Sequence, residues 1–343
     1  MFGLMLCASC RIALLTGKKK LLSRVYGNSF LTIAASKARS CNSRLLKKRG
    51  EPEFKVTDGL VHARPPRHSN GYPGTRTGQE VPPLETRGWA FQEYLLSPRV
   101  LHFASDEMVW HCNKEPSCEC RFESAMVSGK LSISTHSRAS LRKIIESELS
   151  SREIDQVWHR CVEQYSQRQF TRQSDVLPAL SGVARIFEDK KNARYFAGIW
   201  DSSKLHDLCW RRLPTPQPTL EKDTHEDENG YICPLWPWPA ARGPILFRTI
   251  DEYRITAQNL QMEIINASTT PPIYDPFGKV PAGFLVIHSW SFQVSLAIRD
   301  DLSISRVSVD EENDAAFREI LEVRLTPGST LDRLPTRIRA PTS

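Results

Sequence analysis

The 343-residue sequence predicts an α/β protein, in which a sheet-and-helix core is followed by a helical segment and then by an antiparallel β-rich region. Three observations support this order. The segment 87–110 combines a helix pattern with a hairpin pattern, apolar residues recur at helical spacing around 157–165, and residues 284–296 alternate with a period of two. The length suits one large or two modest domains.

The segment from Arg87 to Trp110 is the most informative part of the chain. Its first half predicts a short helix with Trp89, Leu95 and Leu96 on one face. Pro98 should end that helix, because a residue before proline is disfavoured in the α region. The apolar runs 100–103 and 108–110 then predict two strands joined by a turn at Ser105 and Asp106.

Glu93 lies near Arg87 and Arg99 in this segment, which leaves two interpretations. Glu93 could be a functional carboxylate held by two guanidinium groups. The expected reading is a structural ion pair that orients the helix against the hairpin.

The regions on either side follow from local patterns. Residues 25–35 predict a helix end, an Asn/Gly turn and a short buried strand, whereas 47–83, rich in Pro, Gly, His and Arg, predicts a long loop. In the helical region 126–212, Ser174 is expected to cap a helix, and Asp175 is read as part of that cap rather than as a catalytic acid. The apolar helix faces would carry Val157, Trp158, Cys161, Val162 and Tyr165, and then Leu177, Leu180, Ala184 and Phe187.

The rest of the C-terminal half divides by composition. Residues 195–200 predict a buried connector and 205–210 a short helix, before a Pro-rich, acidic linker at 213–230. Region 231–326 is expected to be β-rich, because Phe284, Val286 and His288 alternate as in a half-buried sheet. The tail 327–343 is expected to be disordered.

Charge and cysteine content are those of a soluble cytoplasmic protein. The net charge is +7, and basic residues gather at Lys18–Lys20, Lys47–Arg49 and Arg333–Arg339, where solvated ends are expected rather than nucleic-acid contacts. Nine cysteines without a framework favour a reducing compartment. Residues 1–16 are apolar but lack a basic leading region and are too short to cross a bilayer, so no membrane segment is expected.

No motif assembles a nucleophile, a base and an orienting group, or a phosphate loop, so no cofactor and no defined small-molecule ligand is expected. The densest donor cluster is His111 with Cys112, Cys118 and Cys120. It lacks zinc-finger spacing, so free cysteines are expected rather than a metal site. The tryptophans could line a ligand pocket, but packing between domains is the expected role; they are Trp158, Trp200, Trp210, Trp236 and Trp238.

The residues Arg87-Gly88-Trp89-x-x-Gln92-Glu93, continued by the run that contains Pro98 and Arg99, resemble the signature that closes the fungal heterokaryon-incompatibility (HET) domain. Further similarity lies in the Val-Tyr helix and Leu-Thr-Ile-Ala-Ala strand at 25–35, in 158–182 with Tyr165-Ser166-x-Arg168, in 197–210 and in 275–283. Residues 234–239 are similar to a family Pro-Ser-Trp-Ser-Trp-Ala motif but carry extra prolines. The likeness covers roughly residues 21–300.

The resemblance implies that 21–125 is the C-terminal part of a HET/TIR-like core whose N-terminal strand motifs are missing, and that 1–20 is a leader outside the family pattern. Read one base out of frame, permitted codons for 8–22 can encode a family-like stretch. A shifted reading frame and an ordinary variable N-terminus are the two interpretations. Without the missing strands, the strand at 31–34 is expected to have an unpaired edge.

The resemblance also implies a role in vegetative incompatibility and programmed cell death, as a non-enzymatic signalling or interaction module. Its partners would be other proteins or further copies of the chain. Two alternatives stay open: an NAD-consuming TIR-like effector and an inactive remnant of a decayed gene. They differ in expected outcome, since the effector would deplete NAD and the remnant would be poorly soluble and without effect.

Overall fold

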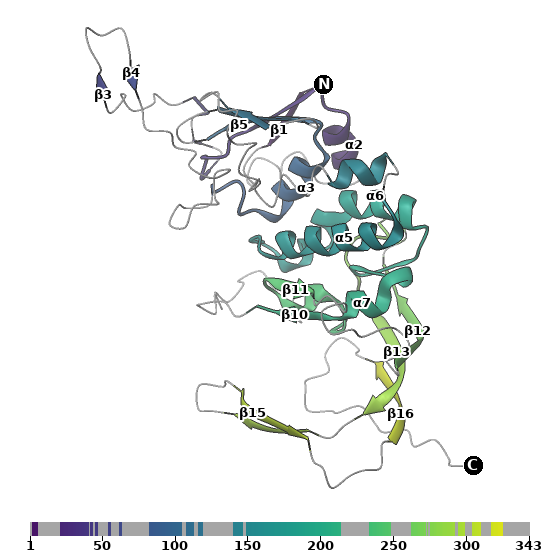
Figure 1. Cartoon of the computed structure of the whole chain (residues 1–343). Helices are drawn as coiled ribbons and strands as arrows, with labels where there is room; N and C mark the ends of the chain where they lie inside the picture. Colours follow the sequence, from purple (N-terminus) through teal and green to yellow (C-terminus); the bar gives the residue numbers. More distant parts are fainter. Residues whose placement is uncertain are drawn as a thin grey trace.

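The computed structural model describes residues 2–5, 21–40, 42–43, 45–46, 54–55, 62–63, 82–104, 108–112, 116–118, 140–146, 149–213, 233–247, 262–271, 273, 275–291, 294–298, 304–309 and 317–324. The described residues form a mixture of helices and small sheets, with antiparallel sheets in the C-terminal region. Figure 1 shows a sheet with α2 and α3 at one end, the helices α5, α6 and α7 in the middle, and β12, β13 and β16 at the other end. The first two parts are named the sheet layer and the helical layer below.

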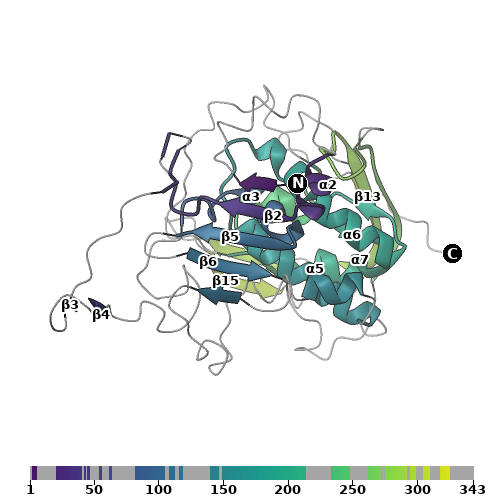
Figure 2. The same cartoon turned by 90° about the horizontal axis from the view of Figure 1, so that it is seen from above.

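The sheet layer is built on five strands in the order β1-β2-β5-β6-β7. These are β1 (Phe2–Met5), β2 (Leu31–Ala34), β5 (Arg99–Phe103), β6 (Met108–Cys112) and β7 (Pro116–Cys118). The first three strands are parallel and the last pairings are antiparallel, and Figure 2 shows β2, β5 and β6 side by side. The prediction that the strand at 31–34 has an unpaired edge is wrong, because β2 pairs with β1 on one side and with β5 on the other.

The predicted helix and hairpin of the 87–110 segment are confirmed. Helix α3 (Gly88–Leu96) ends at Ser97, whose backbone N–H donates to the carbonyl of Glu93, and Pro98 follows. Strands β5 and β6 then pair in antiparallel register, whereas the predicted turn at 105–106 lies outside the described residues. Leu95 is buried, and Trp89 and Leu96 pack against the same core at its margin. Helix α2 (Leu21–Gly27) precedes β2, as predicted.

The helical layer begins with α5 (Ser151–Ser166), which a capping box starts. The Ser150 hydroxyl accepts from the backbone N–H of Glu153, and the Glu153 carboxylate accepts from the backbone N–H of Ser150. Every residue predicted for the apolar face of α5 is buried, which confirms the helical spacing.

Helix α6 (Ser181–Lys191) differs from its prediction at its N-terminus. The cap expected at Ser174 is wrong, because two 3-10 turns, Gln173–Asp175 and Pro178–Leu180, precede the helix. The helix starts after Leu180 without a side-chain cap of its own. The predicted apolar positions are nevertheless all buried, namely Leu177, Leu180, Ala184 and Phe187.

The predicted buried connector is a small hairpin of β8 (Tyr195–Phe196) and β9 (Ile199–Trp200). The carbonyl of Gly198 accepts hydrogen bonds from the indoles of Trp158 (3.2 Å) and Trp238 (3.1 Å). Gly198 has a φ of 104°, and a Cβ there would meet the Trp238 indole at 2.3 Å, so both the backbone and the space require glycine. Trp158, Trp200 and Trp238 are buried, which places three of the five tryptophans in the core.

The helical layer contains residues from both sides of the predicted linker 213–230. Helix α7 (Lys204–Leu208) leads to β10 (Trp210–Arg212), which pairs with β11 (Ile245–Phe247). The buried residues of β11 belong to the same core cluster as α5 and α6. Nearly all of the linker, and the whole 327–343 tail, lie outside the described residues.

The C-terminal region contains a three-stranded antiparallel sheet in the order β12-β13-β16, with strands Met262–Thr269, Gly283–Ser291 and Phe317–Arg324. Strands β14 (Val294–Ile298) and β15 (Ile304–Val309) form a second antiparallel pair. In β13 the buried residue is Leu285, while Phe284, Val286 and His288 are half-buried. The predicted strand is present, but the residues that contact the core are Leu285 and Ile287 rather than the three expected from the sequence.

The predicted loop 47–83 contains a short antiparallel pair, β3 (Phe54–Lys55) and β4 (His62–Ala63), among residues that otherwise lie outside the description. Among the described residues, no helix combines the length and the apolar character that crossing a membrane requires.

Candidate functional site

The start of α3 docks the sheet layer on the C-terminal end of α5. The backbone N–H of Gly88 donates to the carbonyl of Gln169 (3.1 Å), and the N–H of Gln169 donates to the carbonyl of Thr86 (2.6 Å). A Cβ on Gly88 would lie 2.0 Å from the Phe170 ring. The signature glycine is therefore required by the close approach of an aromatic ring from the other layer.

Two further signature residues reach across to the same part of the helical layer. The indole of Trp89 donates to the Asp175 carboxylate (3.1 Å). The side-chain carbonyl of Gln92, which is buried, accepts from the backbone N–H of Gly182 (2.9 Å) in the first turn of α6. Gln92 thus supplies the acceptor that an N-cap side chain would give. The contact of residues 84–92 with residues 165–182 is named the layer joint.

The charged signature residues do not form the ion pair expected from the sequence. Arg99 donates to the carbonyl of Phe30 (3.3 Å) and lies over the Phe30 ring at 5.0 Å. Arg87 donates to the carbonyl of Arg39 (3.4 Å). Glu93 is fully buried within α3, and no ion pair between it and either arginine occurs among the described contacts. The arginines instead connect the segment to the residue before β2 and to the chain that follows β2.

We expect Gln92→Ala to lower the free energy of unfolding by about 1–3 kcal/mol, because it leaves the buried N–H of Gly182 without its acceptor. Urea denaturation followed by tryptophan fluorescence measures this loss. Gln167→Ala is the matched control, since Gln167 is exposed and bonds only within its own helix. Equal effects of the two substitutions would contradict the docking role of Gln92.

A buried polar cluster lies between α3 and the sheet. The Tyr94 hydroxyl hydrogen-bonds to His111 Nδ1 (2.8 Å), and the Ser36 hydroxyl hydrogen-bonds to His102 Nδ1 (2.9 Å). The two imidazole rings are 5.0 Å apart, and both histidines are buried. His102 and His111 occupy inward positions on neighbouring strands, because their register partners are Val109 and Val100.

The sequence analysis assigned His111 to the metal candidate and did not connect it with His102. The available signal was the hairpin, since two strands whose apolar residues alternate inward also place His102 and His111 inward. For the metal candidate, the backbone of Cys118 lies opposite Val109, three residues along β6 from Cys112. The side chain of Cys118 and all of Cys120 lie outside the described residues. Among the residues that are described, no three His, Cys, Asp or Glu side chains are grouped as a metal site.

Sequence reasoning missed a charged pair in the layer joint. Burial raises the pKa of the Glu85 carboxyl to about 7, although the nearby charge of Arg168 acts to lower it. Arg168 is half-buried, and its guanidinium lies over the Phe91 ring at 5.3 Å. Glu85 can therefore exchange a proton near neutral pH, a property common in functional carboxylates. Nothing in the sequence signals its burial, because it precedes the helix in a proline-flanked turn.

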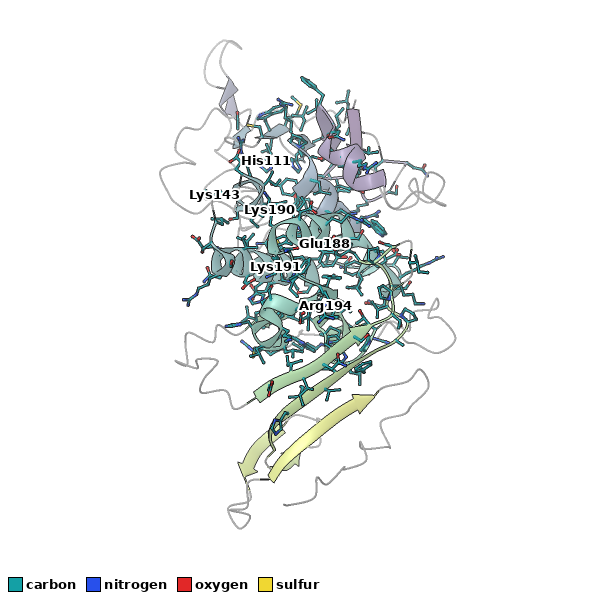
Figure 3. The ribbon with its side chains drawn as sticks, turned by 90° about the vertical axis from the view of Figure 1, so that its right-hand side faces the viewer. His111, Lys143, Glu188, Lys190, Lys191 and Arg194 are labelled. Carbon is teal, nitrogen blue, oxygen red and sulfur yellow. The ribbon has the colours of Figure 1, made fainter. Side chains whose placement is uncertain are left out.

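A second polar network, centred on Asp207, lies in the helical layer. Asp207 Oδ1 bonds to His159 Nε2 (2.7 Å), and its Oδ2 accepts from the backbone N–H of Trp200 (2.8 Å) and the Ser203 hydroxyl (3.1 Å). Lys191 donates to Ser203 and forms an ion pair with Asp155. Figure 3 shows Lys191 in the helical layer, well separated from His111 in the sheet layer, so the two polar networks are distinct.

The Asp207 network ties α5, α6 and α7 together, whereas the layer joint and the histidine cluster connect the helices to the sheet. The layer joint is the candidate functional site, because it unites Gly88, Trp89 and Gln92 of the signature with titratable groups. No family model matches the sequence, and searches of the curated proteins and of the solved structures give no match.

Proposed function

We propose that this chain is a signalling and interaction module of the HET type, acting in the cytoplasm through protein partners or self-association rather than by catalysis. The observation that carries the proposal is the use of the signature. Gly88, Trp89 and Gln92 contact Phe170, Asp175 and Gly182, which are three separate points of the helical layer.

This use of the signature supports a scaffold role. The Trp89 indole and the Gln92 side-chain carbonyl form hydrogen bonds with residues of the helical layer, and Gly88 lies against the Phe170 ring. A motif used in this way fixes how two layers meet, and so determines the surface that a partner would bind. The partner residues Phe170, Asp175 and Gly182 lie in the stretch 158–182, which shares the resemblance to HET proteins.

The test is expression of the full chain in fungal cells, with measurement of growth, of NAD, and of oligomeric state by light scattering after purification. We expect growth arrest and concentration-dependent self-association without a preceding fall in NAD. Trp89→Phe, which removes the bond to Asp175, should weaken both effects. Trp210→Phe is the matched control, since it removes a similar indole bond to the Trp236 carbonyl (3.1 Å) outside the layer joint.

Three results would overturn the proposal. NAD loss before growth arrest would favour the NAD-consuming alternative. An insoluble chain without effect on growth would favour the inactive remnant. Identical behaviour of the Trp89→Phe and Trp210→Phe variants would show that the layer joint has no special part in the activity.

A further inference from the structure

Glu85 lies in a turn at the edge of the layer joint, and backbone hydrogen bonds hold this turn in place. The N–H of Glu85 donates to the carbonyl of Pro82 (2.8 Å), and the N–H of Leu84 donates to that of Ser36 (3.3 Å). The following residue, Thr86, accepts from Gln169 of the helical layer. These bonds hold the backbone at Glu85 beside the interface between the layers, where Arg168 is the charge that acts on its carboxyl.

The carboxyl lacks a full set of partners inside this interface. Its Oε1 atom is inaccessible to solvent and accepts no hydrogen bond, although the residue as a whole is only half-buried. The Arg168 guanidinium makes no hydrogen bond or ion pair with any described side chain and lies on the Phe91 ring. An ionised carboxylate in such surroundings lacks the hydration it has in water, whereas a neutral carboxylic acid is tolerated.

We propose that Glu85 and Arg168 form a proton-controlled latch, in which the layer joint is closed when Glu85 is protonated and loosens when Glu85 ionises. The latch is a property of the layer joint and holds whether or not the chain has the proposed signalling role. Opening would hydrate the carboxylate and would expose the signature residues Trp89 and Gln92.

The direction follows from linkage. Burial raises the pKa of Glu85 from 4.5 to about 7 in the closed joint, so the closed joint binds the proton more tightly than an open, hydrated one. Closure is most favoured below pH 4.5, the pKa of the hydrated carboxyl. It weakens as pH rises from 4.5 to about 7, the pKa in the closed joint, and weakens no further above that. For a single such group, the ratio of open to closed molecules should rise about tenfold between pH 6 and pH 8.

Charged or titratable residues also lie on the elements that bond to the Glu85 turn or to α3. They are Lys37 and Arg39 after β2, Arg87 before α3, Glu93 and Tyr94 in α3, His102 and His111 in the sheet, and Arg168 after α5. Among these, Arg168 is the group whose charge lowers the pKa of Glu85. Burial lowers the pKa of Arg168, and Glu85 and Tyr94 act in the opposite direction.

The experiment is hydrogen–deuterium exchange of the full chain at pH 6, 7 and 8, corrected for intrinsic exchange. Peptides that cover 84–92 and 165–176 should open about tenfold more at pH 8 than at pH 6. Glu85→Gln should abolish this dependence. Glu188→Gln is the matched control, because Glu188 also has a raised pKa but is exposed on α6. This variant should keep the pH dependence of opening.

A second variant covers the case in which Glu85→Gln does not fold. Arg168→Gln removes the charge that lowers the pKa of Glu85, so the midpoint of opening should move to higher pH. A pH dependence that survives in Glu85→Gln, or a midpoint that stays fixed in Arg168→Gln, would overturn the latch.

Discussion

Gly88→Ala is expected to destabilise the protein by about 3 kcal/mol, because the added methyl group would overlap the Phe170 ring in the layer joint. The ring lies 2.0 Å from the position of the new Cβ, and Phe170 packs at the margin of the main core. Relief would require the ring or the whole α3 start to move away. The backbone bonds that join Gly88 and Thr86 to Gln169 oppose that movement.

The decisive measurement is a double-mutant cycle in urea denaturation. Phe170→Leu should itself be mildly destabilising, but in its presence Gly88→Ala should cost far less than it does alone. Gly27→Ala is the control substitution, since a Cβ at Gly27 would meet nothing within 4 Å. If Gly88→Ala costs the same with either residue at 170, the close approach does not explain the signature glycine.

Asp207→Ala is expected to lower the free energy of unfolding by about 3–5 kcal/mol, more than the loss of any other polar side chain in the two polar networks. The side chain is fully buried and satisfies His159, the Trp200 backbone and Ser203 together. Its removal leaves all three groups without their acceptor and leaves a void between α5 and α7. Thermal and urea unfolding should both report the loss.

Asp201→Ala is the matched control for Asp207. Asp201 lies six residues earlier and pairs with Arg194 (2.9 Å) and Lys204 (3.0 Å), but these side chains are partly exposed. Its replacement should cost less than about 1 kcal/mol, as is typical of surface ion pairs. Similar losses for the two aspartates would show that burial does not set the importance of Asp207.

The elements that could be predicted from sequence are those fixed by local patterns. The α5 face follows from apolar spacing of 3.6 residues, and the α3 stop follows from Pro98, which acts on its immediate neighbour. The β5–β6 hairpin also depends on a short stretch of chain. In each case the determining residues lie within a few positions of the element they determine.

The features that were missed depend on residues far apart in the chain. The N-terminus of α6 is capped by Gln92, which is 90 residues away, so the local candidate Ser174 was chosen instead. The pairing of His102 with His111 was missed because the two were judged separately, although they face inward on one hairpin. The raised pKa of Glu85 depends on burial in a joint that also contains Arg168, a residue from a distant part of the chain. Local sequence carries no measure of that burial.

The parallel pairing of β2 with β5 has a consequence for the order of folding. Bringing these strands together closes a long loop, since the Ser36–His102 bond beside them spans 66 residues. The loss of chain entropy on closing this loop occurs before the strand contacts can stabilise the structure. The α5 and α6 helices form through contacts close in sequence. We therefore expect the helical layer to form early and to act as the template on which α3, and then the sheet, assembles. Pulse-labelled hydrogen exchange during refolding should show protection in 154–187 before protection in 31–34.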